Sequence, residues 1–185
     1  MTKIIRCAWC TQDPLYQHYH DHEWGKPVYE EHQLFEMLCL EGQQAGLSWI
    51  TVLKKREAYR QHFFNLAIED IARITDEELL KKQQDPQLIR HLAKLTSIRD
   101  NAQAWLKLKS DVYDVSDWLW SFTKHITMQQ NKIDAQNIPS YTIQSEQLAS
   151  ALKQKGFKFV GKTTCYAFMQ ACGMVNDHET RCTFR

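Results

Sequence analysis

Two Cys/His pairs stand near the two ends of this 185-residue chain. Cys7 and His20 are separated by twelve residues, and His178 and Cys182 by three. Two thiolates and two imidazoles complete the tetrahedral shell of a Zn²⁺ ion and leave no position open for a reacting water. A zinc ion bound in this way would join the two termini of the chain. The pattern therefore predicts a structural zinc site and indicates that any chemistry lies elsewhere.

Two neighbouring residues leave alternatives open for the first pair. Cys7 and Cys10 have the spacing of a zinc knuckle or a redox motif, and His22 follows His20 after one residue. On the residues alone, Cys10 is an alternative thiolate ligand and His22 an alternative imidazole ligand. The remaining cysteines fall in apolar segments and are expected to be small buried residues: Cys39, Cys165 and Cys172.

The composition is that of an ordinary globular domain. Hydrophobic residues make up 43% of the chain and the net charge is +1, so bulk charge does not predict a nucleic-acid partner. The longest apolar runs are too short to span a membrane, and residues 1–7 lack the core of a signal peptide. We therefore expect a cytoplasmic protein whose six cysteines are thiols or metal ligands rather than disulfides.

Apolar residues recur at helical spacing along much of the chain, whereas strand-like alternation is weak. Segments with one apolar face are found at 30–42, 87–109 and 114–122. Thr75 and Glu78 have the form of a capping box that opens another helix. The sequence predicts one all-α domain over 1–185, built from about eight to ten short helices, with more helix than the usual third.

A pair of helices is expected in the C-terminal third, one from Ser145 to a stop at Gly156 and one over 162–172, closed by Gly173. A tight link between two helices exposes backbone N–H groups at the start of the second, where the helix dipole suits a phosphate. The lysines of this region have no acidic residue between them: Lys153, Lys155, Lys158 and Lys162. The alternative interpretation is a plain αα-hairpin with a solvated lysine face.

The segment 40–49 is the strongest candidate for chemistry. Glu41 comes at the end of an apolar helix, and Gly46 and Leu47 are placed at a turn before Trp49. Without further evidence, a glutamate at a helix end is more often solvated, and tryptophans such as Trp49 are more often core or rim residues. The alternative for Gly46 and Leu47 is an ordinary helix–helix turn with a buried leucine. The basic run 54–56 that follows suits either phosphate contact or a solvated face.

These features together resemble the 3-methyladenine DNA glycosylase I family of the helix-hairpin-helix superfamily. The hairpin of that superfamily commonly ends in Val-Gly followed by Lys-Thr, as at 160–163 here. The resemblance extends over nearly the whole chain and depends on these segments: 6–9, 13–16, 19–21, 23–25, 40–49, 156–161 and 175–178. It implies a helix-hairpin-helix element at about 145–173 and a zinc site formed from 7–20 and 178–182.

The resemblance implies a base-excision repair enzyme that acts on alkylated double-stranded DNA at the bacterial nucleoid. It would flip out 3-methyladenine, hydrolyse its N-glycosidic bond and release the free base. Thr163 stands where superfamily members that also cut the backbone have a lysine, which implies an abasic site without strand cleavage. The resemblance also favours Cys7 over Cys10 and His20 over His22 as zinc ligands. Nothing suggests more than a monomer.

Residue roles follow from the same resemblance. Methylation at N3 makes adenine cationic, which suits an aromatic wall and a carboxylate acceptor. Glu41 and Tyr19 are the expected catalytic residues that read the adenine edge, and the residues expected to bind the base are Trp49, Trp9 and Trp24. Gly46 and Leu47 would fill the gap left by the flipped base. The residues expected to hold the DNA backbone are Lys158, Val160, Gly161, Lys162 and Thr163.

Asp177 lies near the place of a catalytic aspartate found in most of the superfamily, but it adjoins His178. We expect it to orient an imidazole rather than to act on the base. Two alternative functions remain at this stage. A non-catalytic damage sensor would share the hairpin and the pocket, and a zinc-stabilised interaction module without a nucleic-acid role fits the near-neutral net charge.

Overall fold

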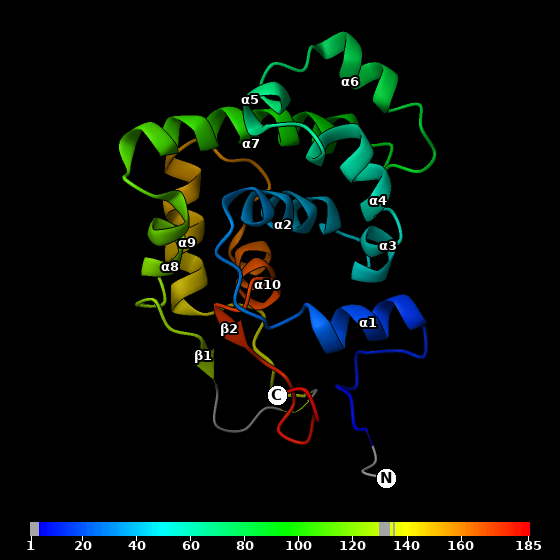
Figure 1. Cartoon of the computed structure of the whole chain (residues 1–185), viewed down its shortest axis with the longest axis vertical. Helices are drawn as coiled ribbons and strands as arrows, with labels where there is room; N and C mark the ends of the chain where they lie inside the picture. Colours follow the sequence, from blue (N-terminus) through cyan, green and yellow to red (C-terminus); the bar gives the residue numbers. More distant parts are fainter. Residues whose placement is uncertain (1–3, 130–133, 135) are drawn as a thin grey trace.

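The computed structural model describes residues 4–129, 134 and 136–185, and their regular secondary structure is mostly helical (Figure 1). The helices are α1 (Pro14–His22), α2 (Glu31–Gln44), α3 (Trp49–Leu53), α4 (Arg56–Tyr59), the π-helical turn η1 (Arg60–Phe64), α5 (Ile68–Ile71), α6 (Asp76–Lys82), α7 (Leu92–Asp111), α8 (Val115–Ser121), α9 (Ile143–Gln154) and α10 (Lys162–Ala171). None of the helices in these ranges is both long enough and apolar enough to cross a membrane.

The prediction of a helical domain is confirmed, with one small exception. Two short strands, β1 (Met128–Gln129) and β2 (Val175–Asn176), pair in parallel, with Met128 opposite Val175. Both segments are extended connections that lie side by side, so each supplies hydrogen-bond partners for backbone groups of the other. The domain is therefore nearly, but not strictly, all-α.

The predicted helix boundaries are close but shifted in two places. The helix expected from Ser145 begins at Ile143, because Thr142 is the N-cap and Ser145 is the third residue of a capping box. The helix expected over 87–109 begins only at Leu92, because the His91 side chain accepts from the Lys94 amide and caps the helix there. Gly173, just after the C-terminal end of α10, has φ +75°, and a Cβ there would collide with the backbone of Lys26, so the predicted stop at this glycine is a steric requirement.

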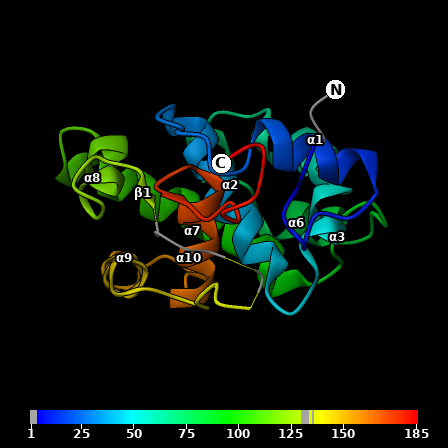
Figure 2. The same ribbon diagram turned by 90° about the horizontal axis from the view of Figure 1, so that it is seen from below.

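The helices α2, α7 and α10 form the centre of the molecule. α2 packs on both α7 and α10, and α10 packs on α9 (Figures 1 and 2). The largest fully buried side chains are Trp105, Trp120, Tyr59, Phe35 and Phe63. Each such side chain contributes roughly 1.5–3 kcal/mol by leaving water, so this core holds the three helices in fixed positions.

A second, smaller cluster joins the ends of the chain. Cys7, Tyr19, Trp24, Leu53 and Cys182 pack together in this cluster, and Trp49 packs against both it and the main core. Beside this cluster, the Thr183 amide donates to the Ile5 carbonyl at 2.8 Å. The N-terminal and C-terminal segments therefore lie side by side, as a site shared between them requires.

Candidate functional site

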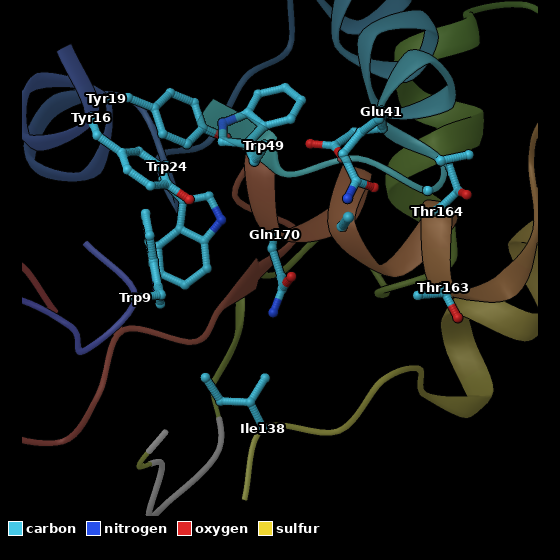
Figure 3. A pocket seen from close by; sticks show the side chains of 14 residues that line it. Trp9, Tyr16, Tyr19, Trp24, Glu41, Trp49, Ile138, Thr163, Thr164 and Gln170 are labelled. Carbon is cyan, nitrogen blue, oxygen red and sulfur yellow. The ribbon is translucent and has the colours of Figure 1, made fainter. Parts of the chain in front are cut away.

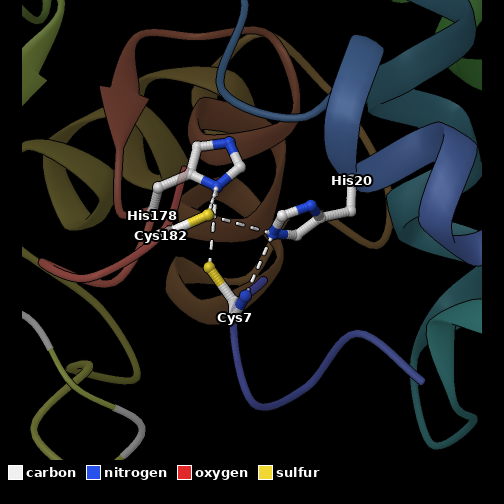
Figure 4. A group of neighbouring side chains, drawn as sticks. All are labelled: Cys7, His20, His178 and Cys182. Atoms are coloured by element: carbon white, nitrogen blue, oxygen red, sulfur yellow. Dashed lines mark hydrogen bonds between the residues drawn. The ribbon is translucent and has the colours of Figure 1, made fainter. Parts of the chain in front are cut away.

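The four predicted ligands come together from three separate segments (Figure 4). Their ligand atoms all lie within 4.8 Å of one another, and all four residues are buried. Nδ1 of His178 is 3.5 Å from Sγ of Cys7 and 3.4 Å from Sγ of Cys182, and Nε2 of His20 is 3.6 Å from Sγ of Cys182. A tetrahedral zinc ion with ordinary bond lengths separates sulfur from nitrogen by roughly 3.6 Å. The cluster therefore has the dimensions of a four-coordinate metal site.

The nitrogen of each imidazole that faces away from the thiols is held by a second group. Nδ1 of His20 lies 2.7 Å from Oδ1 of Asp21, which also forms an ion pair with Arg6. Nε2 of His178 lies 3.2 Å from the carbonyl oxygen of Trp24. These contacts fix both rings with one nitrogen directed at the thiols, as metal-binding histidines require.

The electrostatics of the cluster also suit a cation. Burial raises the pKa of the Cys7 thiol to about 12, so a nearby positive charge is needed to stabilise its thiolate. Burial lowers the pKa of His178 to about 4, which keeps its imidazole neutral and able to coordinate. The four side chains can therefore hold a metal ion that binds thiolate and neutral imidazole.

The two alternative ligands lie outside this cluster. Cys10 is half-buried, and its thiol donates weakly to the carbonyl oxygens of Thr11 and Tyr16. His22 is exposed at the end of α1, where its ring packs against that of His18. Neither residue belongs to the group of possible ligands among the described residues.

The expectation that Asp177 orients an imidazole is wrong. Its carboxylate accepts hydrogen bonds from the Tyr166 hydroxyl and from Nε2 of Gln170, at 2.8 Å for the latter. Both partners are on α10, so the Asp177 side chain is bonded to that helix and not to an imidazole of the Cys/His cluster. The role expected of it is performed for His20 by Asp21.

A cavity of about 580 Å³ lies beside the Cys/His cluster (Figure 3). It opens between α1, the C-terminal end of α2, the start of α3 and one face of α10. Its aromatic wall consists of Trp9, Tyr16, Tyr19, Trp24 and Trp49. The rings are in contact, with centroids 5.4 Å apart for Tyr19 and Trp49 and 4.9 Å apart for Trp9 and Trp24. The pocket therefore presents an extended π surface to a flat ligand.

Glu41 supplies the one acidic side chain of this pocket lining among the described residues. It lies in the last turn of α2, is only 4% exposed, and forms no hydrogen bond or ion pair with any residue in the described ranges. Burial raises its pKa to about 8. The solvated helix-end interpretation is therefore wrong: the carboxyl group is desolvated, unpaired and available to a ligand, and a cationic ligand would favour its ionised form.

Sequence reasoning missed part of the pocket. Tyr16 lies in one of the segments that carry the family resemblance and Gln170 lies on α10, and neither was predicted as a pocket residue. The face that α10 turns to the pocket consists of Thr163, Thr164, Ala167 and Gln170. These residues are spaced as one helix face, and that periodicity was the available signal.

The turn between α2 and α3 is exposed at the pocket mouth. Gly46 lines the pocket with φ +79°, a conformation that favours glycine. Leu47 next to it is 39% exposed, and its carbonyl oxygen accepts from the Gln44 side chain. The alternative of an ordinary turn with a buried leucine is therefore wrong, and an apolar side chain projects beside the pocket.

The hairpin lies where it was predicted, with α9 and α10 packed together through a loop at 155–161. Gly161 is the N-cap of α10 and has no side chain to cap it, so the first N–H groups of this ten-residue helix are open to a ligand. Thr163 and Lys158 are exposed, whereas the Val160 side chain is buried in the main core. Val160 can therefore contribute only its backbone to a surface contact.

Most basic side chains near the pocket already have partners within the protein. Lys162 lies 3.3 Å from Glu146 and over the ring of Tyr141, and Lys155 pairs with Asp111. In the basic run 54–56, Lys54 pairs with Asp13, Lys55 donates to the Pro86 carbonyl, and Arg56 pairs with Glu23. This run therefore joins helices to one another, and is not simply a solvated face.

A family model for methyladenine glycosylases matches residues 9–185. The chain belongs to this family. It is 49% identical over 177 residues to DNA-3-methyladenine glycosylase 1 of Escherichia coli strain K12, covering 96% of this chain and 95% of that protein. The family predicted from the sequence is therefore confirmed, and with it the prediction of a glycosylase enzyme.

Solved structures agree with this assignment. A crystal structure of 3-methyladenine DNA glycosylase I superposes with a TM-score of 0.94 at 50% identity, covering 97% of this chain and 98% of that one. A tyrosine-to-phenylalanine variant of 3-methyladenine DNA glycosylase I in complex with 3-methyladenine superposes with a TM-score of 0.92 at 36% identity, covering 96% of each chain.

In this methyladenine glycosylase the Cys/His cluster and the aromatic wall are in direct contact. Trp24 lines the pocket with its ring while its carbonyl oxygen holds His178. The ring of Trp9, also in the pocket, lies 5.1 Å from the ring of His20. The cluster therefore supports one side of the pocket as well as joining the termini.

Proposed function

We propose that this protein removes 3-methyladenine from alkylated double-stranded DNA by hydrolysing its N-glycosidic bond. The products are free 3-methyladenine and an abasic site in an uncut strand. The observation that supports this most strongly is the buried, unpaired carboxylate of Glu41 beside an aromatic wall. The related glycosylase that has been solved with 3-methyladenine supports the same substrate.

The chemistry needs little more than selection and orientation. Methylation at N3 places a positive charge on the adenine ring, so the base is already a good leaving group. When the bond between C1′ and N9 breaks, its electron pair goes to the base and neutralises that charge. The oxygen of a water molecule bonds to C1′, and one proton of that water passes to solvent. The pocket therefore has to hold the cationic base, and it need not protonate it.

Glu41 and Tyr19 are assigned to the edge of the base, and Trp49 to its face. A cation over a tryptophan ring gains roughly 0.5–2 kcal/mol, and more when water is excluded. Glu41 in the free protein has a pKa of about 8 because of burial, and a cationic base favours its ionised form. Trp9 and Trp24 complete the aromatic wall. Neutral adenine has no positive charge to interact with Glu41 and the rings, so it lacks the electrostatic part of the binding free energy.

The lesion must leave the stack to reach this pocket, which costs a few kcal/mol and less for a damaged base. Leu47, exposed at the pocket mouth, is the side chain assigned to the gap in the duplex. Backbone N–H groups of Gly161, Lys162 and Thr163 at the start of α10 are assigned to a phosphate, with Lys158 nearby. Thr163 has no amine that could attack the sugar, which accounts for a strand left uncut.

We propose Zn²⁺ as the metal of the Cys7, His20, His178 and Cys182 cluster. Two thiolates and two imidazoles at tetrahedral spacing are typical of structural zinc. With four protein ligands the ion supplies cross-linking of the termini and no activated water. The protein is proposed to act as a monomer in the cytoplasm, on DNA of the nucleoid.

The test is base release from duplex DNA methylated at adenine N3, with the free bases separated and the strand sized before and after alkali. We expect 3-methyladenine to be released and the strand to break only with alkali. Binding without release would replace this proposal with a damage sensor. Neither binding nor release, from folded and metal-loaded protein, would favour an interaction module without a nucleic-acid role.

The variant Glu41→Gln connects the activity to the pocket. Hydrogen bonds to charged groups contribute about 1.5–3 kcal/mol, so we expect release to slow by roughly 10- to 100-fold. Glu57→Gln is the matched control, because Glu57 is exposed on α4 and outside the pocket. Equal release rates for the two variants would remove the role assigned to Glu41.

A further inference from the structure

The long helix α7 has a row of buried polar side chains on one face. Lys94, Ser97 and Asn101 are all less than 10% exposed and follow one another at steps of three and four residues. α7 itself lies outside the pocket lining. Buried polar groups are costly unless they are hydrogen-bonded, so their partners indicate what the row does.

Lys94 is bonded to the turn that carries Leu47. Its ammonium donates to the carbonyl oxygens of Gln43 and Ala45, at 2.8 and 2.6 Å. The Gln43 side chain donates back to the Lys94 carbonyl at 2.8 Å. No carboxylate in the described ranges forms an ion pair with Lys94. Its charge instead faces the carbonyl end of α2, the negative end of that helix dipole.

Asn101 is bonded to the loop of the hairpin. Its Nδ2 donates to the Lys158 carbonyl at 3.2 Å, and its Oδ1 accepts from the Lys158 amide at 2.7 Å. The next residue, Phe159, has φ +55°, a strained conformation for a side chain of this size. Asn101 therefore stabilises a tight turn immediately before the N-terminus of α10.

The two bonded segments lie against each other, and each adjoins a residue that lines the pocket. A Cβ on Gly42 would be 3.2 Å from Cβ of Phe159, so α2 and the hairpin loop are in contact. Beyond that contact, Gly46 and Thr163 both line the pocket. The hydrogen bonds that Lys94 donates out of α7, and those that Asn101 forms with Lys158, end on backbone groups of these two segments. Asn101 also forms a side-chain hydrogen bond with Cys39 of α2.

We propose that Lys94 and Asn101 are positioning residues that set the separation between the 45–48 turn and the 157–161 loop. With that separation fixed, the leucine wedge and the phosphate-binding N–H groups engage one duplex at the same time. The inference rests on the proposed function. It assigns the two residues to steps that need DNA and not to binding of the base alone.

The experiment measures two properties of Lys94→Met and Asn101→Leu, which keep side-chain size and remove the hydrogen bonds. One is the affinity for free 3-methyladenine, followed by fluorescence of the pocket tryptophans. The other is single-turnover release of 3-methyladenine from methylated duplex, expressed per molecule able to bind the free base. That normalisation keeps the result meaningful if a variant is partly unfolded. Gln103→Ala is the control, because Gln103 is exposed on α7 and donates to the Ala72 carbonyl, away from both loops.

We expect free-base affinity within twofold of the parent for all three variants, and release slowed at least tenfold for Lys94→Met and Asn101→Leu only. Release within twofold of the parent would overturn the inference. An equal loss of base affinity and release would also overturn it, because the residues would then be supports of the whole fold. A parent protein that releases no 3-methyladenine would instead contradict the proposed function, and this inference with it.

Discussion

Oδ1 of Asp21 lies 2.7 Å from Nδ1 of His20, and the opposite nitrogen of the same ring faces the thiol of Cys182. Arg6 binds the same carboxylate at 2.7 Å. A charged carboxylate behind a metal-binding imidazole fixes its tautomer and increases its basicity. The metal affinity of this cluster is therefore expected to depend on a residue that is not itself a ligand.

Asp21→Asn is expected to weaken metal binding by roughly 10- to 100-fold, the usual effect of removing such a partner. The amide can still contact the ring but has lost the charge that increases its basicity. Competition with a chromophoric chelator measures the change. Asp117→Asn, at an exposed aspartate 3.4 Å from His125, is the control. An unchanged affinity in Asp21→Asn would show that Asp21 does not support the ligand.

Cys182→Ala is expected to lower stability more than it lowers release per folded molecule, because Cys182 lies outside the pocket. A loss of about 3 kcal/mol corresponds to a fall of roughly 6–12 °C in melting temperature for a chain of this size. The variant should also lose its sensitivity to chelator. Cys10→Ala should melt like the parent and keep that sensitivity, since Cys10 lies outside the cluster. Equal responses of the two variants would argue against a bound metal.

Glu41 makes stability depend on pH in a direction that can be checked. Burial raises its pKa from 4.5 to about 8 in the folded protein, so its protonated form favours folding. The contribution is fully present below pH 4.5 and is lost as pH rises through 8, at about 1.4 kcal/mol per pH unit between these values. Glu41→Gln has no such loss and should gain stability relative to the parent from pH 5 to pH 9.

Denaturant unfolding of the parent and of Glu41→Gln from pH 5 to pH 9 measures the difference between their free energies of unfolding. The contributions of the other titrating groups cancel in this difference. For the exposed Glu57→Gln the difference from the parent should stay flat. A difference that is equally flat for Glu41→Gln would mean that the carboxyl is not desolvated in solution.

Leu47→Ala is expected to leave the fold intact and to weaken engagement of methylated duplex about tenfold. An exposed surface substitution usually changes stability by no more than about 0.5 kcal/mol, whereas a wedge offsets several kcal/mol of unstacking. Titration of duplex, together with free-base affinity, separates the two effects. Leu80→Ala is the control, because Leu80 is exposed on α6. Equal duplex affinities for the two variants would remove the wedge.

The sequence by itself determined most of the helices, because capping and apolar periodicity act within a few residues. The capping box at Thr75 and the end of α10 before Gly173 are local hydrogen-bonding and steric events, and both were predicted. The two Cys/His pairs were also predicted, although the choice of Cys7 over Cys10 and of His20 over His22 came from the family resemblance and not from the residues alone. The start of the helix expected at Ser145 was misplaced, because two residues, Thr142 and Ser145, share one cap.

Only the tertiary structure decided which polar groups lose their water. Glu41 is next to ordinary helix residues in sequence, and its raised pKa comes from burial among helices that are distant along the chain. The same applies to Asp21 behind His20, to Gln170 in the pocket and to Lys94 beneath the turn. Desolvation depends on all the atoms that surround a group, whereas a sequence pattern records only its neighbours along the backbone. The chemical character of the pocket therefore depends on how α1, α2, α7 and α10 pack together, which a sequence pattern does not record.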